Sequence, residues 1–194
     1  MGSGVEAAAV QGRGGARDET MNKLGLLLGR LHAAEVDLGD EWRKIAERHA
    51  TDHDVWHIGH QLAEQCRARA ESVRSIGERH DITIREPHEA PWDTLLATIR
   101  RTGAEALGRR PEPGLLLLMD LRGLYTAAHE VDLYWTMLGQ VAQALRDRTT
   151  LDEVDGLHRQ LLTQIKWIKT KTKEASPQIL AVGIPLVGRH HDAG

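Results

Sequence analysis

Apolar residues recur along four stretches of the sequence at alternating intervals of three and four positions, which places them on one face of an α-helix. The stretches cover residues 21–48, 51–80, 115–147 and 150–177. The third stretch is the longest and the most apolar. Thr51 with Asp54 and Thr150 with Glu153 resemble capping boxes at the starts of the second and fourth stretches. The pattern predicts an all-α protein built as a four-helix bundle.

The segments outside these stretches have different compositions. Residues 81–114 contain Pro87 and Pro91, so we expect a long connection that includes a short helix over 92–107. Residues 1–18 are rich in Gly and Ala without periodicity and are predicted to be a disordered N-terminal arm. Residues 178–194 are apolar but interrupted by Gly and Pro, which predicts an extended docking tail. The expected bundle therefore covers residues 19–177.

The composition limits the class of protein. A chain of 194 residues is long enough for one domain with a substantial core. It has 41% hydrophobic and 27% charged residues, which is ordinary for a globular protein. Because the chain contains no Phe, its core must be mainly Leu, Ile, Val and Ala, with five Trp and two Tyr. That composition favours helices over strands.

Charge and cysteine content limit the partners and the compartment. A formal net charge of −3 argues against nucleic acid as a general partner, because phosphate binding needs a basic surface. Cys66 is the single cysteine, so no internal disulfide can form. Neither a secretory signal nor an apolar span of membrane length is evident, and we expect a cytoplasmic protein without a membrane partner.

Three ionisable residues lie on apolar helical faces and supply the candidate chemistry. Glu35 falls between Leu31 and Leu38 on the seam of the first helix. Glu130 has apolar neighbours on the third helix, and His158 shares a face with apolar residues of the fourth. An unpaired carboxylate there would be costly, so we predict that Glu35 and Glu130 are buried, each in contact with a polar partner.

With these residues the chain resembles the ferritin-like superfamily, whose bundles hold two metals with a Glu from each of two helices and Glu-x-x-His from each of the other two. Glu35 and Glu130 occupy the positions of the two single carboxylates, and Asp155 with His158 is a shortened form of the motif. The second helix departs from the pattern. At the matching depth it offers Gln61, Glu64 and Gln65, while His57 and His60 lie nearer its start. The resemblance implies iron or manganese as the metal.

The same residues have simpler interpretations. Glu35 and Glu130 can be neutralised by a neighbouring Arg, His or Tyr rather than by a metal. His53, His57, His60 and Glu64 form a row opposite the apolar stripe, typical of a solvated face or an interface. Depth also matters. Only if the long connection crosses the whole bundle do Glu35, Glu130 and His158 share a layer; with a plain up-down-up-down order they do not.

Two functions follow from these alternatives. The first is a non-catalytic helical bundle without a cofactor that acts by protein–protein interaction or self-association, and so is expected to form a homo-oligomer. The second is a ferritin-like metal-binding protein for iron or manganese storage or redox chemistry.

Overall fold

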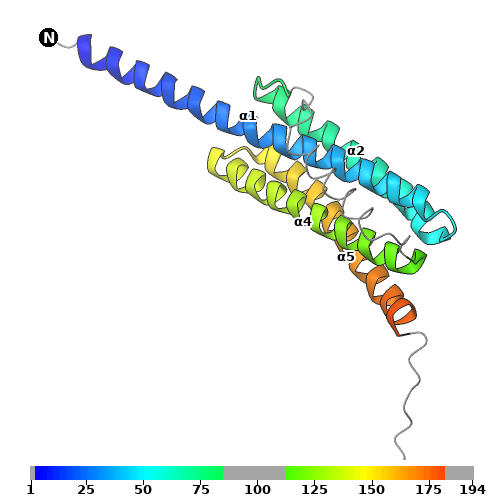
Figure 1. Ribbon diagram of the computed structural model, residues 1–194. Helices are drawn as coiled ribbons and strands as arrows, with labels where there is room; N and C mark the ends of the chain where they lie inside the picture. The colour runs from blue at the N-terminus through cyan, green and yellow to red at the C-terminus, as the bar shows by residue number, and fades with distance from the viewer. Residues whose placement is uncertain (1–2, 85–111, 182–194) are drawn as a thin grey trace, which may run out of the picture.

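The computed structural model describes residues 3–84 and 112–181, with side chains from residue 19 onward. Its helices are α1 (Ser3–Arg48), α2 (His53–Arg79), α4 (Pro113–Leu145) and α5 (Arg148–Leu180), shown in Figure 1. No strand occurs in the described ranges, so the prediction of an all-α protein with four long helices is confirmed. None of these helices is long and apolar enough to cross a membrane. The short helix expected over 92–107 lies outside the described residues.

Side-chain contacts fix the helix directions. The C-terminal end of α1 meets the start of α4, where Arg48 contacts Asp120, and the middle of α1 meets the later part of α4, where Glu35 contacts Trp135. These two helices are therefore antiparallel. Helices α2 and α5 are antiparallel as well, because Lys171 contacts Asp52 at one end. At the other end Arg79 contacts Glu153.

The two ends of the α2–α4 connection lie at opposite ends of the helices. Ile82, just after α2, packs beside Gly25 near the start of the packed part of α1. The start of α4, by contrast, is beside the end of α1. With α1 and α4 antiparallel, the order of directions is up-down-down-up. Glu35, Glu130 and His158 therefore occur at comparable depth along the helices.

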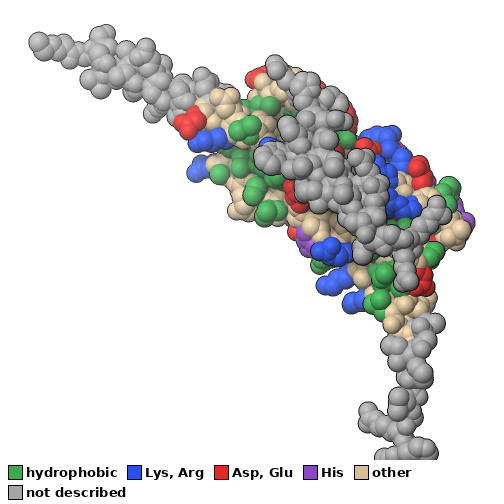
Figure 2. Space-filling model, viewed as in Figure 1, with side chains coloured by type: hydrophobic (Ala, Val, Ile, Leu, Met, Phe, Trp, Pro, Cys, Tyr) green, Lys and Arg blue, Asp and Glu red, His purple; other side chains and the backbone are tan. Residues whose placement is uncertain are grey.

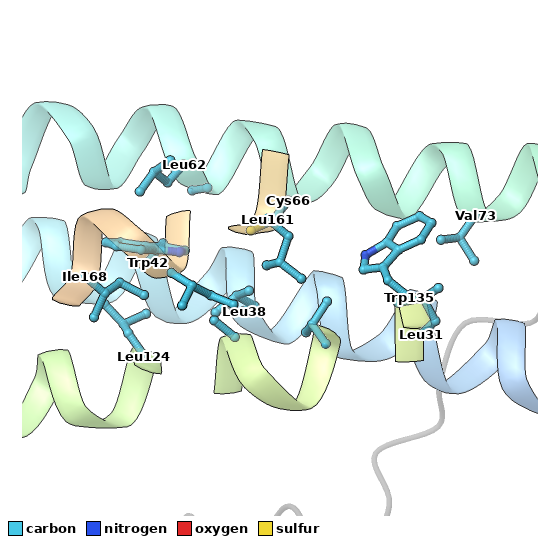
Figure 3. Packing of buried hydrophobic residues seen from close by; sticks show 14 of the residues in the cluster. Leu31, Leu38, Trp42, Leu62, Cys66, Val73, Leu124, Trp135, Leu161 and Ile168 are labelled. Atoms are coloured by element: carbon cyan, nitrogen blue, oxygen red, sulfur yellow. The ribbon is translucent and has the colours of Figure 1, made fainter. Parts of the chain in front are cut away.

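One hydrophobic core joins all four helices. Trp42 of α1 and Trp135 of α4 are its largest apolar side chains, and both are fully buried among Leu, Ile and Val (Figure 3). The ring of Trp42 meets the edge of Trp167 from α5 at a centroid distance of 5.7 Å. Each large aliphatic residue buried in this way contributes about 1.5–3 kcal/mol through the hydrophobic effect.

The helix caps differ from those expected. Asp52, rather than Thr51, caps α2, with its side chain accepting from the Val55 N–H at 3.1 Å. Asp147 caps α5 by accepting from the N–H of Thr150 at 3.0 Å. Thr150 is buried within the first turn instead of standing before it. In both cases an Asp carboxylate, a stronger acceptor than a hydroxyl, satisfies an N–H that the helix leaves unpaired.

Two helix ends extend past the predicted limits. Helix α1 begins at Ser3, before the periodic pattern that starts at Met21. Helix α5 continues through Pro177 to Leu180, because proline removes only one N–H and the Ala181 N–H still bonds to the Pro177 carbonyl at 3.1 Å. Ile179 packs closely on Gly114 of α4, where a Cβ atom would lie 2.9 Å from its Cγ1. The rest of the predicted tail, from residue 182, lies outside the described residues.

Candidate functional site

The centre of the core contains an ion pair. Glu35 of α1 and Arg69 of α2 are both fully buried, and their side chains meet in a bidentate arrangement. The Arg69 Nε donates to Glu35 Oε1 at 2.7 Å and Nη2 donates to Oε2 at 2.8 Å. Two parallel charge-assisted bonds are the strongest way in which a guanidinium can neutralise a carboxylate. The prediction that Glu35 is buried beside a charged partner is confirmed.

The other two helices complete this buried polar cluster. From α4, the indole Nε1 of Trp135 donates to Glu35 Oε1 at 2.7 Å. From α5, Gln164 Oε1 accepts from Arg69 Nη2 at 3.3 Å, and its Nε2 donates to Gln65 Oε1 at 3.2 Å. The cluster therefore links all four helices through polar contacts at one depth of the core.

Cys66 belongs to the same cluster but is not a reactive thiol. Its Sγ accepts from Arg69 Nη2 at 3.2 Å and lies 3.7 Å from Gln164 Oε1. Burial, opposed in part by the charge of Arg69, raises the pKa of the Cys66 thiol to about 12. Figure 3 shows Cys66 among apolar side chains of the core. The thiol is protonated and shielded, so it serves as a small core residue, as its place on the apolar stripe of α2 predicts.

The guanidinium of Arg69 is held in its charged form. Burial alone would lower its pKa, but the hydrogen bonds and the negative charge of Glu35 outweigh that effect and raise it. Its Nη1 is buried without a hydrogen-bond acceptor among the described residues. The cluster is thus fully paired on the carboxylate and incompletely paired on the guanidinium.

The other predicted metal ligands of α4 and α5 do not join Glu35. Glu130 is exposed, and among the described residues its carboxylate has Tyr134 Oη as its one hydrogen-bond partner, at 3.5 Å, so the prediction that it is buried is wrong. Asp155 is also exposed, and His158 is half-buried with its Nε2 2.5 Å from Asp132 Oδ1. The physical reason for Glu130 is that α4 is apolar on most of its circumference, so apolar neighbours do not identify its buried face.

The candidate residues of α2 lie at its surface. Gln61, Glu64 and His57 are exposed and His60 is half-buried. The rings of His57 and His60 contact Trp56, with centroid distances of 4.7 and 5.0 Å. The carboxylate of Glu64 lies near the guanidinium groups of Arg67 and Arg43. The interpretation of this row as a solvated face agrees with its exposure.

Two members of the buried cluster, Arg69 and Gln164, were missed by sequence reasoning, and Trp135 was expected on the apolar face of α4 without its hydrogen bond to Glu35. For Arg69 a signal was present, because the apolar stripe of α2 is interrupted between Cys66 and Val73, where one turn of the helix should supply a buried residue. A basic residue in that gap complements an acidic residue on the neighbouring seam. Gln164 stands between Leu161 and Ile165 and gives no comparable charge signal.

The surface carries several large apolar side chains outside this core. Leu115, Met119, Leu133 and Met137 of α4 are exposed, and hydrophobic side chains are visible along α4 in Figure 2. Exposed apolar residues that gather on one helix are typical of an interaction surface.

Comparisons with known proteins add no family to this geometry. No family model matches the sequence, and neither the curated proteins nor the solved structures give a significant match. The description of the candidate site therefore rests on the contacts within this chain.

Proposed function

We propose that the protein is a non-catalytic four-helix bundle that acts through protein–protein interaction, with self-association as its principal form. One observation carries the proposal: polar groups in the core bind one another, whereas apolar groups of α4 face solvent. A buried ion pair that consumes both oxygens of Glu35 offers no group to a substrate. An exposed apolar face needs a covering surface, which a protein partner supplies.

The helix directions support a ferritin-like arrangement within this proposal. A connection from the end of α2 to the start of α4 that runs from one end of the bundle to the other, with α1 and α4 antiparallel, is the topology of ferritin-like bundles, which have one long crossover. The proposed likeness to ferritin-like bundles is limited to the order and direction of the helices. It does not extend to the chemistry of the superfamily.

The residues do not fit a ferritin-like metal pair. Both oxygens of Glu35 are bonded to Arg69, and Arg69 brings a positive charge to the place where the metals would lie. Within residues 19–84 and 112–181, no three His, Cys, Asp or Glu side chains lie close enough together to hold a metal ion. The arrangement around Glu35 therefore does not support an iron or manganese site at this position.

Two measurements on one preparation test the proposal. Sedimentation velocity from low to high micromolar concentration is expected to show reversible self-association. Metal analysis of protein purified without chelator is expected to show no stoichiometric iron or manganese, in the wild type or in Glu35→Gln. A chain that stays monomeric at every concentration would contradict the proposal. One or two metal ions per chain, lost in Glu35→Gln, would favour the metal-binding alternative instead.

A further inference from the structure

The exposed residues of α4 follow a symmetric order. At 100° per residue, seven positions from Leu115 to Met137 fall within about 80° of arc, on the side of α4 that faces away from the core. They are, in order, Leu115, Met119, Arg122, Thr126, Glu130, Leu133 and Met137, and all are exposed. We call these seven residues the outer α4 face. It spans about 33 Å along the helix at 1.5 Å per residue.

Thr126 is the centre of this order. Met119 and Leu133 stand seven residues on either side of it, and Leu115 and Met137 stand eleven residues away. The exposed fractions match in the same pairs, 58% with 55% and 42% with 43%. When the direction of the helix is reversed about Thr126, each apolar position falls on another apolar position.

Reversal also exchanges two opposite charges. Arg122 and Glu130 stand four residues on either side of Thr126. They are about 12 Å apart along the same helix, too far to pair with each other. No ion pair joins either of them to another residue in the described part of the chain. Across a two-fold axis at Thr126, however, each lies level with the opposite charge of the other copy.

We propose that the outer α4 face binds the same face of a second copy of this chain, with the two α4 helices antiparallel and the two-fold axis at Thr126. This inference rests on the proposed function and names its surface and its partner. A two-fold interface requires a self-complementary patch, which is what the reversed order provides. Apolar residues cover one another on both sides of the axis, and two symmetric Arg122–Glu130 pairs set the register.

The charges select the antiparallel arrangement over the parallel one. A parallel pair of α4 helices would place Arg122 beside Arg122 and Glu130 beside Glu130, and like charges at an interface oppose association. Thr126, the residue at the axis, is of moderate size, and Gly123 beside it has no neighbouring atom within 4 Å of where its Cβ would be. Both permit the helices to approach closely at the crossing point.

A charge swap tests the surface and the register together. Arg122→Glu and Glu130→Arg each place like charges opposite one another, so each is expected to weaken the self-association constant at least about tenfold. The double variant Arg122→Glu/Glu130→Arg restores opposite charges and should return the constant to within about threefold of the wild type. Leu26→Glu, at an exposed apolar residue of α1, is the control and should leave association unchanged. Circular dichroism checks that every variant is folded.

The outcomes separate this inference from the proposed function. If the wild type associates but neither single variant weakens it, the outer α4 face is not the interface, while the proposed function stands. Weakening in both single variants without recovery in the double variant would overturn the antiparallel register. A wild type that is monomeric throughout refutes both proposals. A monomeric wild type in which Leu133→Glu lowers the melting temperature would show that another segment of the same chain covers the face.

Cross-linking gives a second, independent test of the axis. Thr126→Cys places a thiol on the two-fold axis, where two copies can form a disulfide under mild oxidation. Leu26→Cys is the matched control, since it is also exposed but lies on α1. We expect a covalent dimer from Thr126→Cys alone. Equal cross-linking of the two variants, or none from Thr126→Cys in a preparation that self-associates, would overturn the position of the axis.

Discussion

Removing one partner of the Glu35–Arg69 pair should destabilise the fold more than any surface substitution. In Glu35→Gln the side chain keeps nearly the same shape and can still accept from Trp135, but Arg69 is left as a buried charge without a counter-ion. Breaking a fully buried ion pair in this way costs about 3–5 kcal/mol. That is a large part of the roughly 5–15 kcal/mol by which a domain is usually stable.

The predicted loss can be measured in two ways. Urea unfolding followed by circular dichroism gives the free energy of unfolding, and thermal unfolding should show a melting temperature lower by roughly 6–20 °C for a chain of this length. Glu47→Gln is the matched control because it makes the same chemical change at an exposed carboxylate of α1, the helix that carries Glu35. It should alter the free energy of unfolding by no more than about 0.5 kcal/mol.

A double-mutant cycle separates the pairing from the shape. Replacing both partners by apolar residues, in Glu35→Leu/Arg69→Met, removes both buried charges at once, and this double variant should be no less stable than either of the single variants Glu35→Leu and Arg69→Met. A free energy of unfolding for Glu35→Gln within about 1 kcal/mol of the wild-type value would contradict this role of the ion pair, as would single effects of Glu35→Leu and Arg69→Met that simply add in the double variant.

Three further predictions follow from the caps, the helix contacts and the thiol. Hydrogen bonds from Thr150 hold the pKa of Asp147 below its usual value, so Asp147→Ala should cost about 1 kcal/mol in urea unfolding at pH 7. That stability is present above the unfolded pKa of about 3.9 and is lost as the pH falls through the lower folded value; an equal cost at pH 2 would contradict it. Gly59→Ala should lower the melting temperature, because its Cβ would lie 2.8 Å from that of Ala46, whereas Gly156→Ala, with open space around it, should raise it slightly; the opposite order would refute this packing. Cys66, with its pKa near 12, should resist a thiol reagent at pH 8 until urea unfolds the chain, and rapid labelling of the native protein would show that it is accessible.

The helices could be predicted from the sequence because their pattern is locally determined. A period of 3.6 residues fixes which positions share a face, and the seam of α1 from Leu24 to Ile45 is buried as the pattern indicates. The ends were less predictable. Asp52 and Thr51 are both good capping residues, and which one caps α2 depends on where the chain turns after α1.

The buried cluster shows which part of a site a sequence can specify. Depth follows from counting residues along antiparallel helices, and Glu35 and Asp132, the partner of His158, do lie near the same level of α4. Pairing depends instead on which side chains of neighbouring helices face each other. Gln164 reaches the cluster only because α5 packs against α2 at that depth, a tertiary contact with no local signal.

The error at Glu130 bears directly on the proposed interface. Its apolar neighbours on α4 suggested a buried position, yet Met137, one of those neighbours, is itself exposed. An exposed helical face with apolar residues on both sides of a charged pair differs from an ordinary solvated face, which carries polar residues throughout. The pattern that wrongly predicted burial within one chain is the pattern expected of a helix that is covered only after two chains meet. In the proposed dimer Glu130 has a physical role that the monomer does not show: it faces the Arg122 of a second copy, and its charge fixes the direction in which the two helices pair.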